Sequence, residues 1–273
     1  MAAPSPGGGT ISTSELVFVS AGGKGEKYNI YDDPCFFEGY RRMREDPQSA
    51  NNLIEQPALR ACLPPLEGLE VVDLGCGMGH LSLYLAEGGA SHVLATDASE
   101  RMLAVAKSER PHERVEFRLC AMEDLELPPE SFDLVASSLS VHYVADHAAL
   151  AGKVAHWLRH GGRFVYSVEH PFKTAPEDPD KDWVGDDAED EGFHWPLRGY
   201  CEEGEREQNW YAEGIVKHHR KLSSMLNYLI ASGMVIERVE EPEEVLAAGR
   251  TEPVFPQNVH RPSVLVIRSA KDA

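Results

Sequence analysis

The chain has 273 residues, 42% of them hydrophobic, and a formal net charge of −19 from 45 acidic and 26 basic side chains. A chain of this size can bury a full core, and a strongly acidic surface repels phosphate backbones, which disfavours nucleic acid as a partner. No apolar run approaches the roughly 18 residues of a membrane span, so no membrane partner is expected. Five scattered cysteines without a Cys-x-x-Cys pair indicate reduced thiols of the cytoplasm and no metal site.

The first 66 residues comprise a tail and a helical segment. Residues 1–27 are rich in Gly, Ser and Pro and lack a basic start, which predicts a flexible tail rather than a signal peptide. A helix is expected to begin at Asp33-Pro34, with Asp at the N-cap and Pro at the first helical position. Phe36 and Tyr40 then fall on one face of that helix. This aromatic face either walls a binding site or packs on the edge of a sheet.

Residues 70–80 read Glu-Val-Val-Asp-Leu-Gly-Cys-Gly-Met-Gly-His, an apolar strand that runs into a glycine-rich turn. Gly75, Gly77 and Gly79 permit a tight turn and the close approach of a ligand to the backbone, as in nucleotide-binding strand–loop–helix units. Asp73 disfavours pyrophosphate, which gains from a helix N-terminus without a neighbouring carboxylate. This acid fits a nucleoside that carries positive charge, such as S-adenosylmethionine, which has an ammonium and a sulfonium and no phosphate.

Helices and strands alternate after the glycines. We expect helices at 80–87, 99–107 and 146–158, and strands at 92–96, 115–120, 132–139 and 163–168. Such alternation predicts a parallel, doubly wound sheet. Asp97 follows the second strand, 22 residues after Gly75. At that spacing an acid is placed to accept hydrogen bonds from ribose hydroxyls.

The segment 172–221 separates the fifth strand from a helix expected at 222–232, and strands at 234–240 and 263–268 follow that helix. Its acidic first half, 177–191, is typical of a solvated loop. In its second half, aromatic and β-type residues flank Glu203-Gly204-Glu205, which predicts a β-hairpin with its turn at 203–205. Ligands of open α/β sheets bind at the carboxyl end of the strands, so this hairpin is expected to roof the pocket.

Four segments in order, VVDLGCGMG, VLATDAS, AMEDLELPPESFDLV and LRHGGRFVYSVEHP, resemble the motifs of class I S-adenosylmethionine-dependent methyltransferases. The small-molecule group that includes the quinone-biosynthesis methyltransferases is the most similar. The resemblance covers roughly residues 68–172 and resumes near 222–269. An NAD-type Rossmann domain is disfavoured, because Asp73 is present and a Gly-x-Gly-x-x-Gly motif is absent.

The resemblance implies a doubly wound, Rossmann-like α/β fold with a seven-stranded sheet, whose last strand is antiparallel and lies beside the fifth. It also implies an N-terminal helical lid and an inserted β-hairpin cap. The expected units are a tail at 1–27, the lid at 28–66, the methyltransferase core at 67–171 and 222–273, and the acceptor-binding cap at 172–221.

The resemblance also implies S-adenosylmethionine as the cofactor. Its expected contacts are Asp73, Gly75, Cys76, Gly77, Gly79, Asp97, Ala98, Met102, Met122, Glu123 and Ser138. Asp73 would hold the ammonium, directly or through water, and Asp97 the ribose hydroxyls. Met122 either flanks the adenine or packs in the core, and either Glu123 or Asp124 lies near the exocyclic amine.

The expected reaction is in-line methyl transfer to oxygen, nitrogen or activated carbon of a small molecule, by a monomer or homodimer. An oxygen or nitrogen acceptor must lose a proton, for which histidine is the usual base. His170 and then His142 are the candidates, because each follows a strand at the sheet's carboxyl edge. Glu169 is not expected to orient His170, since neighbours on a strand point to opposite faces. The expected acceptor contacts are Tyr31, Tyr40, Tyr143, Tyr200, Trp210, His218 and Arg220.

A second hypothesis is an enzyme of the same fold that binds S-adenosylmethionine and catalyses a cyclisation, elimination or decarboxylation without methyl transfer. Intact cofactor motifs do not distinguish the two, because both reactions need them.

Overall fold

The computed structural model describes residues 29–176, 183–185, 192–210, 212–244, 251 and 253–272. The predicted tail, 1–27, and most of the acidic stretch 177–191 lie outside this part of the chain. The helices are α1 (Pro34–Glu45), α2 (Gln56–Cys62), α3 (His80–Glu87), α4 (Glu100–Glu109), α5 (His147–Trp157), α6 (Pro171–Thr174) and α7 (Leu222–Ala231). The strands are β1 (Glu70–Leu74), β2 (His92–Asp97), β3 (Val115–Leu119), β4 (Phe132–Ser137), β5 (Leu158–Glu169), β6 (Gly204–Trp210), β7 (Ala212–His219), β8 (Met234–Glu240) and β9 (Val264–Lys271).

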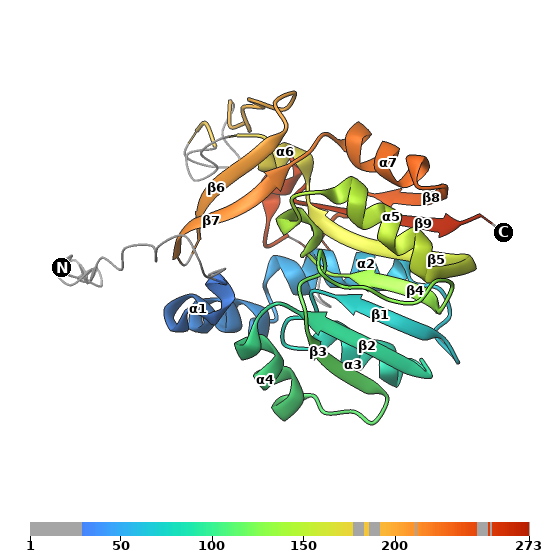
Figure 1. Ribbon diagram of the computed structural model, residues 1–273. Coiled ribbons are helices and arrows are strands. Elements are labelled where there is room, and N and C mark those ends of the chain that lie inside the picture. Colours follow the sequence, from blue (N-terminus) through green and yellow to red (C-terminus); the bar gives the residue numbers. More distant parts are fainter. Residues whose placement is uncertain are drawn as a thin grey trace, which may run out of the picture.

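Seven strands form one sheet in the order β3-β2-β1-β4-β5-β9-β8 (Figure 1). β3, β2, β1, β4 and β5 pair in parallel, whereas β9 runs antiparallel to both β5 and β8. This confirms the predicted doubly wound sheet with an antiparallel last strand beside the fifth. The strand order reverses between β1 and β4, where open α/β sheets bind ligands at the carboxyl edge.

Side-chain caps explain why the predicted helices start where they do. Asp33 Oδ1 accepts from the backbone N of Cys35 and Phe36 at 2.9 Å each, at the start of α1. Ser99 Oγ accepts from Met102 N at 3.0 Å at the start of α4. Such caps satisfy amide groups that have no partner within the helix.

The fifth strand begins earlier than expected. β5 starts at Leu158, not at 163, because Leu158 pairs with Phe132 of β4 across a register shift that lies between Phe132 and Leu134. The glycine pair at 161–162 therefore lies inside an irregular part of the strand.

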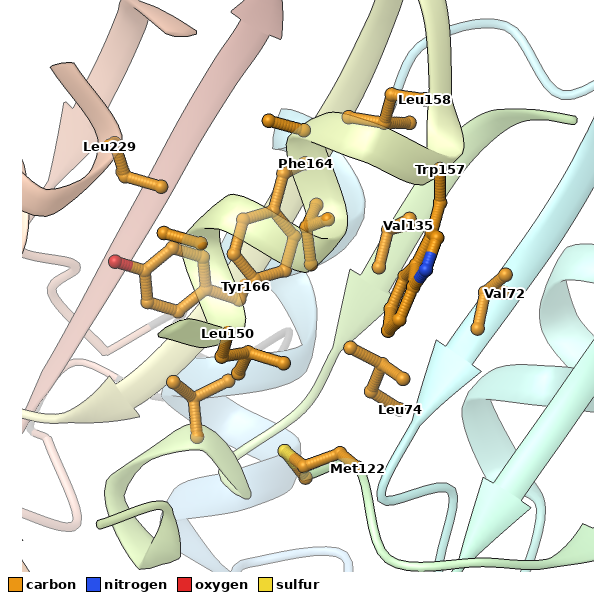
Figure 2. Packing of buried hydrophobic residues seen from close by; sticks show 14 of the residues in the cluster. Val72, Leu74, Met122, Val135, Leu150, Trp157, Leu158, Phe164, Tyr166 and Leu229 are labelled. Carbon is orange, nitrogen blue, oxygen red and sulfur yellow. The ribbon is translucent and has the colours of Figure 1, made fainter. Parts of the chain in front are cut away.

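Helices cover both faces of the sheet (Figure 1). α2 and α3 pack on one face, and α5 and α7 pack on the other, where the larger of the hydrophobic clusters lies. Figure 2 shows that cluster: Trp157, Phe164 and Tyr166 are fully buried, and the rings of Phe164 and Tyr166 stack with centroids 4.5 Å apart. Burial of the Phe164 side chain contributes roughly 1.5–3 kcal/mol to stability.

The inserted hairpin is present as a separate two-stranded sheet, β6 and β7, but its predicted turn is wrong. Gly204 pairs with His219 and Trp210 pairs with Ala212, so 203–205 leads into β6 and the two strands are closest in sequence at Trp210 and Ala212. In β6 the alternating residues Arg206 and Gln208 are buried. Because polar residues lie on the covered face of β6, its sequence does not alternate between apolar and polar residues. Glycine and acids at 203–205 have the composition of a turn.

Candidate active site

The glycine-rich loop connects β1 to α3 at the carboxyl edge of the sheet. Gly75, Gly77 and Gly79 have φ angles of 66°, 55° and 82°. A Cβ added at Gly75 would lie 2.5 Å from Ser140 Cβ, whereas a Cβ added at Gly77 would meet nothing within 4 Å. Gly75 is therefore required by packing, and Gly77 faces open space where a ligand can approach the backbone.

A first pocket lies over this loop, with walls from three parts of the chain. Its lining residues are Tyr40, Arg44 and Asn51 from the N-terminal segment, Asp73, Gly75, Cys76, Gly77, Met78, His80 and Leu81 from the loop region, and Ser138 after β4. The N-terminal segment thus covers the glycine loop.

Asp73 places a carboxylate in the wall of this pocket. The side chain is 1% exposed, and its Oδ2 accepts from Ser82 Oγ at 2.6 Å. Its Oδ1 is buried without a hydrogen-bond partner among the described residues. Burial raises the pKa of the Asp73 carboxyl to about 7. A buried carboxylate oxygen without a donor is costly, and a cationic ligand would satisfy it.

Asp97 ties the glycine loop to the start of α4. Its Oδ2 accepts from Gly77 N at 2.7 Å, and its Oδ1 accepts from Ser99 N at 2.8 Å. Burial raises the pKa of Asp97, and these backbone bonds act in the opposite direction. Met102, which was predicted to contact the cofactor, is buried against Phe37 of α1. Both belong to a small hydrophobic cluster that joins the N-terminal segment to α4.

Met122 lies between the core and the loop. It belongs to the hydrophobic cluster of Figure 2, and its methyl group would be 3.2 Å from a Cβ at Gly75. Glu123 and Asp124, which follow Met122 in the chain, are exposed. Their predicted role near the adenine stays a prediction.

The sequence interpretation missed a buried acid in the N-terminal segment. Glu55 ends a π-helical turn, Asn51–Glu55, and is fully buried. Its Oε1 accepts from Ser138 Oγ at 2.9 Å and from Ser167 Oγ at 2.6 Å, and its Oε2 accepts from Gln56 Nε2 at 2.6 Å. Nothing in the polar segment around Glu55 indicated burial, because its partners come from β5 and from the turn after β4.

Three predicted tyrosines meet where the N-terminal segment contacts the turn after β4. The Tyr31 hydroxyl donates to the Tyr143 hydroxyl at 2.8 Å. The rings of Tyr31 and Tyr40 meet edge to face with centroids 5.3 Å apart. Tyr143 follows His142, and their rings lie 4.4 Å apart.

A second pocket lies between the carboxyl ends of β4 and β5 and the hairpin. Its lining residues are Val141, His142, His147, Val168, Glu169, Pro171, Thr174, His218, Arg220 and Met225. Three residues predicted for catalysis or acceptor contact, His142, His218 and Arg220, therefore come together. His142 Nδ1 is buried without a partner in the described part of the chain, and burial lowers the pKa of this imidazole to about 3.

His170 is engaged at both ring nitrogens. Its Nδ1 accepts from Phe172 N at 3.1 Å as the N-cap of α6, and its Nε2 lies 2.9 Å from Glu241 Oε1. Glu169 does not contact this ring but pairs with Lys173 and Lys217 at 2.5 and 2.8 Å. His170 therefore has a structural role. His142, unlike His170, lines the second pocket.

The other predicted acceptor contacts anchor the cap. The Tyr200 hydroxyl accepts from Leu222 N at 3.1 Å, and its ring lies 5.5 Å from that of Phe172. His219, which adjoins the predicted His218, is buried with its Nδ1 2.9 Å from Thr174 Oγ1. Trp210 ends β6, and its side chain lies outside the described residues.

The described residues contain neither a membrane-spanning helix nor a cluster of metal-ligating side chains. No helix there is long and apolar enough to span a bilayer. No group of three or more His, Cys, Asp or Glu side chains in those ranges is arranged to hold a metal ion.

Comparison with known proteins identifies the family. A model of the methyltransferase domain matches residues 72–166. An S-adenosylmethionine-dependent methyltransferase from Mesorhizobium loti, known from its crystal structure, is 41% identical with a TM-score of 0.73, and the match covers 81% of this chain and 98% of that one. A Haemophilus influenzae protein of uncharacterized function is 35% identical over 253 residues, 90% of this chain and 98% of its own length.

A ubiquinone biosynthesis O-methyltransferase of Sinorhizobium medicae is 39% identical over 114 residues, 41% of this chain. That match covers 46% of the relative, so the chain aligns with less than half of its length. The chain belongs to the class I S-adenosylmethionine-dependent methyltransferases. It is an enzyme whose cofactor is S-adenosylmethionine, as the motifs predicted.

Proposed function

We propose that the protein transfers the methyl group of S-adenosylmethionine to a small-molecule acceptor in the second pocket. The observation that supports this most is the junction between the two pockets. Tyr40 lines the first pocket and contacts Tyr31, whose hydroxyl bonds to Tyr143, and the adjacent His142 lines the second. A cofactor site and an acceptor site on either side of one tyrosine pair suit transfer between bound molecules.

The charges that line the first pocket suit the cofactor. Asp73 Oδ1 has no donor within the described chain, and Gly77 leaves open room above the loop. We assign the ammonium of the cofactor to Asp73 and its carboxylate to Arg44, which lines the same pocket. Asp97 would accept from the ribose hydroxyls beside its two backbone bonds, since an ionised carboxylate offers about four lone-pair sites.

The protein's own residues align the acceptor and exclude water, which is most of what methyl transfer requires. When bound, S-adenosylmethionine supplies an activated methyl group: a lone pair of the acceptor forms the new bond to carbon while the C–S bond breaks and leaves its electrons on sulfur. Of the two predicted bases, we place His142 ahead of His170, because His142 Nδ1 has no partner among the described residues.

Oxygen is the acceptor atom that we favour. The ubiquinone biosynthesis relatives are O-methyltransferases by name, although the alignment covers less than half of them. Among the described residues, no contact in either pocket favours cyclisation, elimination or decarboxylation over methyl transfer.

The test uses S-adenosylmethionine with a deuterated methyl group, incubated with the full chain and a metabolite extract of the source organism. Mass spectrometry should find a compound that carries one labelled methyl, with S-adenosylhomocysteine formed in equal amount. His142→Ala should lower turnover while S-adenosylhomocysteine affinity stays within twofold. Lys107→Ala, at an exposed position of α4, is the control. A compound that disappears without acquiring label would instead favour the non-methylating hypothesis.

A further inference from the structure

Glu55 carries a buried carboxylate whose partners among the described residues are all neutral. The side chain is fully buried, and its hydrogen bonds come from Ser138, Ser167 and Gln56. No Lys, Arg or His in the described ranges forms an ion pair with it. A buried carboxylate is usually paired with a cation, because neutral donors alone leave part of the cost of desolvation uncompensated. A ligand with positive charge can supply that compensation.

The hydrogen-bond directions suit an ionised Glu55. Ser138 Oγ accepts from Gln56 Nε2 at 3.1 Å and donates to Glu55 Oε1 at 2.9 Å. Ser167 Oγ accepts from Leu139 N at 3.0 Å and donates to the same oxygen at 2.6 Å. Gln56 Nε2 donates to the other oxygen at 2.6 Å. Both oxygens of Glu55 therefore act as acceptors, as those of an ionised carboxyl do.

This carboxylate is separated from the first pocket by one hydroxyl group. Ser138, which donates to Glu55, lines that pocket together with Asp73 and Tyr40. Burial raises the pKa of Asp73 and of Tyr40, and the negative charge of Glu55 raises each of them further. Water screens a buried charge less than a charge at the surface, so a ligand in the pocket is also within its influence.

The proposed orientation of S-adenosylmethionine brings its sulfonium into this range. The sulfur joins the amino-acid part of the molecule to the ribose. A cofactor with its ammonium at Asp73 and its ribose at Asp97 therefore has the sulfonium between these two acids. Tyr40 lines the same pocket, and its pKa is raised by burial and also by the charges of Asp97 and Glu55. The two carboxylates thus act on the same part of the pocket.

The sulfur is the part of the cofactor whose charge changes in the reaction. The ammonium assigned to Asp73 and the carboxylate assigned to Arg44 are present in both S-adenosylmethionine and S-adenosylhomocysteine. Methyl transfer converts the sulfonium to a neutral thioether. A negative charge near the sulfur therefore distinguishes the two molecules, whereas Asp73 and Arg44 do not.

We propose that Glu55 determines specificity in the cofactor site, where its buried carboxylate favours the sulfonium of S-adenosylmethionine over the thioether of S-adenosylhomocysteine. This inference rests on the proposed function, which assigns the first pocket to the cofactor. Glu55 thereby favours the exchange of product for fresh cofactor. It does not accelerate the chemical step, because the positive charge on sulfur decreases towards the transition state.

The test is calorimetric titration of the full chain, without acceptor, with S-adenosylmethionine, sinefungin and S-adenosylhomocysteine. Sinefungin has a protonated amine in place of the sulfonium and is not a methyl donor, so it separates the effect of charge from that of the transferable methyl group. In Glu55→Gln, the affinities for S-adenosylmethionine and sinefungin should each fall about fivefold or more relative to that for S-adenosylhomocysteine. A purely structural role would weaken all three alike.

Three further variants separate charge from packing. Glu55→Asp keeps the charge on a shorter side chain, and the ratio of the affinities for S-adenosylmethionine and S-adenosylhomocysteine should stay within about twofold of wild type. Asp73→Asn should weaken all three ligands by the same factor, because each carries the same α-ammonium. Glu87→Gln, at an exposed position of α3, is the matched control and should change none of the affinities.

An unchanged ratio of affinities in Glu55→Gln would overturn the inference, and so would an equal change of the ratio in Glu55→Asp. If Glu55→Gln does not fold, Glu55→Met combined with Ser167→Ala removes the charge together with a donor that would lose its partner, and the same change of ratio is expected. Failure of S-adenosylhomocysteine to bind the wild-type protein, or unchanged binding in Asp73→Asn, would instead count against the proposed function.

Discussion

Asp73 is a proposed ligand of the cofactor, and its burial lowers the stability of the ligand-free protein. It lies at the end of β1 with one oxygen bonded to Ser82 and the other without a donor in the described chain. An acid kept in such surroundings is typical of a site whose ligand completes the bonding, at the expense of stability in the ligand-free state.

The cofactor affinity should therefore depend on pH through Asp73. Burial raises the pKa of this carboxyl to about 7, and only its ionised form attracts an ammonium, which stays protonated below the usual α-amino pKa of about 7.7–8.0. Affinity for S-adenosylhomocysteine should fall up to tenfold per pH unit between pH 6.5 and 5.5. Calorimetry on wild type and Asp73→Asn checks this, since the variant should bind weakly with a flat profile. A wild-type profile as flat as that of the variant would refute the assignment.

The contribution of Asp73 to the stability of the ligand-free fold should decrease as pH rises, whereas the cofactor affinity should increase. The folded pKa of Asp73 exceeds its unfolded value, so the folded state holds the proton more tightly. This contribution is complete below about pH 4 and is lost as pH rises through about 7, with an upper magnitude of roughly 4 kcal/mol. Ligand-free Asp73→Asn should thus exceed wild type in unfolding free energy at pH 8 by more than at pH 5.5. Urea titrations at the two pH values measure the difference, and parallel curves would contradict it.

Asp97 acts on both the loop and, as we propose, the ribose. Asp97→Ala removes the acceptor of Gly77 N and Ser99 N and should weaken S-adenosylhomocysteine binding by about 1–3 kcal/mol. Calorimetry compares it with Glu87→Ala, which alters an exposed acid at the end of α3. Unchanged affinity in Asp97→Ala would show that the motif has been placed in the wrong register.

At the scale of elements, the N-terminal segment is held to the sheet by a buried carboxylate and not only by apolar packing. Glu55 bonds to Ser138 after β4 and to Ser167 of β5, so one acid links three parts of the chain. Ser138 also lines the first pocket. The link therefore connects attachment of this segment to the shape of the cofactor site.

Glu55→Gln should loosen that attachment. The new amide presents a donor where Glu55 accepts from Gln56 Nε2, so at least one buried group loses its partner. We expect a loss of about 1–3 kcal/mol in unfolding free energy and weaker S-adenosylhomocysteine binding. Glu45→Gln, which alters an exposed ion pair with Arg41, is the control and should stay within about 0.5 kcal/mol. Equal stability of the two variants would show that Glu55 does not hold the N-terminal segment to the sheet.

The inserted hairpin is also held by polar contacts. Lys217 reaches Glu169, His219 reaches Thr174, and Arg220 reaches the carbonyls after β4. Each joins β7 or its end to the carboxyl edge of the sheet. Three residues of these contacts, Glu169, Thr174 and Arg220, also line the second pocket.

At the scale of the whole molecule, the two pockets lie at the same edge of one sheet, and each is lined by charges of both signs. Asp73 and Arg44 line the first, whereas Glu169 and Arg220 line the second. The net charge of the chain does not reveal these pairs of opposite charge.

Local sequence was sufficient for the elements whose signals are local. The glycines at 75, 77 and 79, the caps Asp33 and Ser99, and the alternation of apolar runs predicted the parallel sheet and the cofactor loop, because turn, cap and period depend on near neighbours. The hairpin's turn was misplaced because buried Arg206 and Gln208 gave its first strand a polar composition.

The sequence by itself determined the methyltransferase fold, the cofactor and the edge of the sheet at which we propose that the reaction occurs. Only the tertiary structure decided that His170 caps α6, that Glu55 is buried with its carboxylate bonded to Ser138 and Ser167, and that Lys217 shares Glu169 with Lys173. The physical reason is distance along the chain. A motif is a pattern of neighbours, whereas the partner of a buried charge is set by which strands and loops the fold brings together.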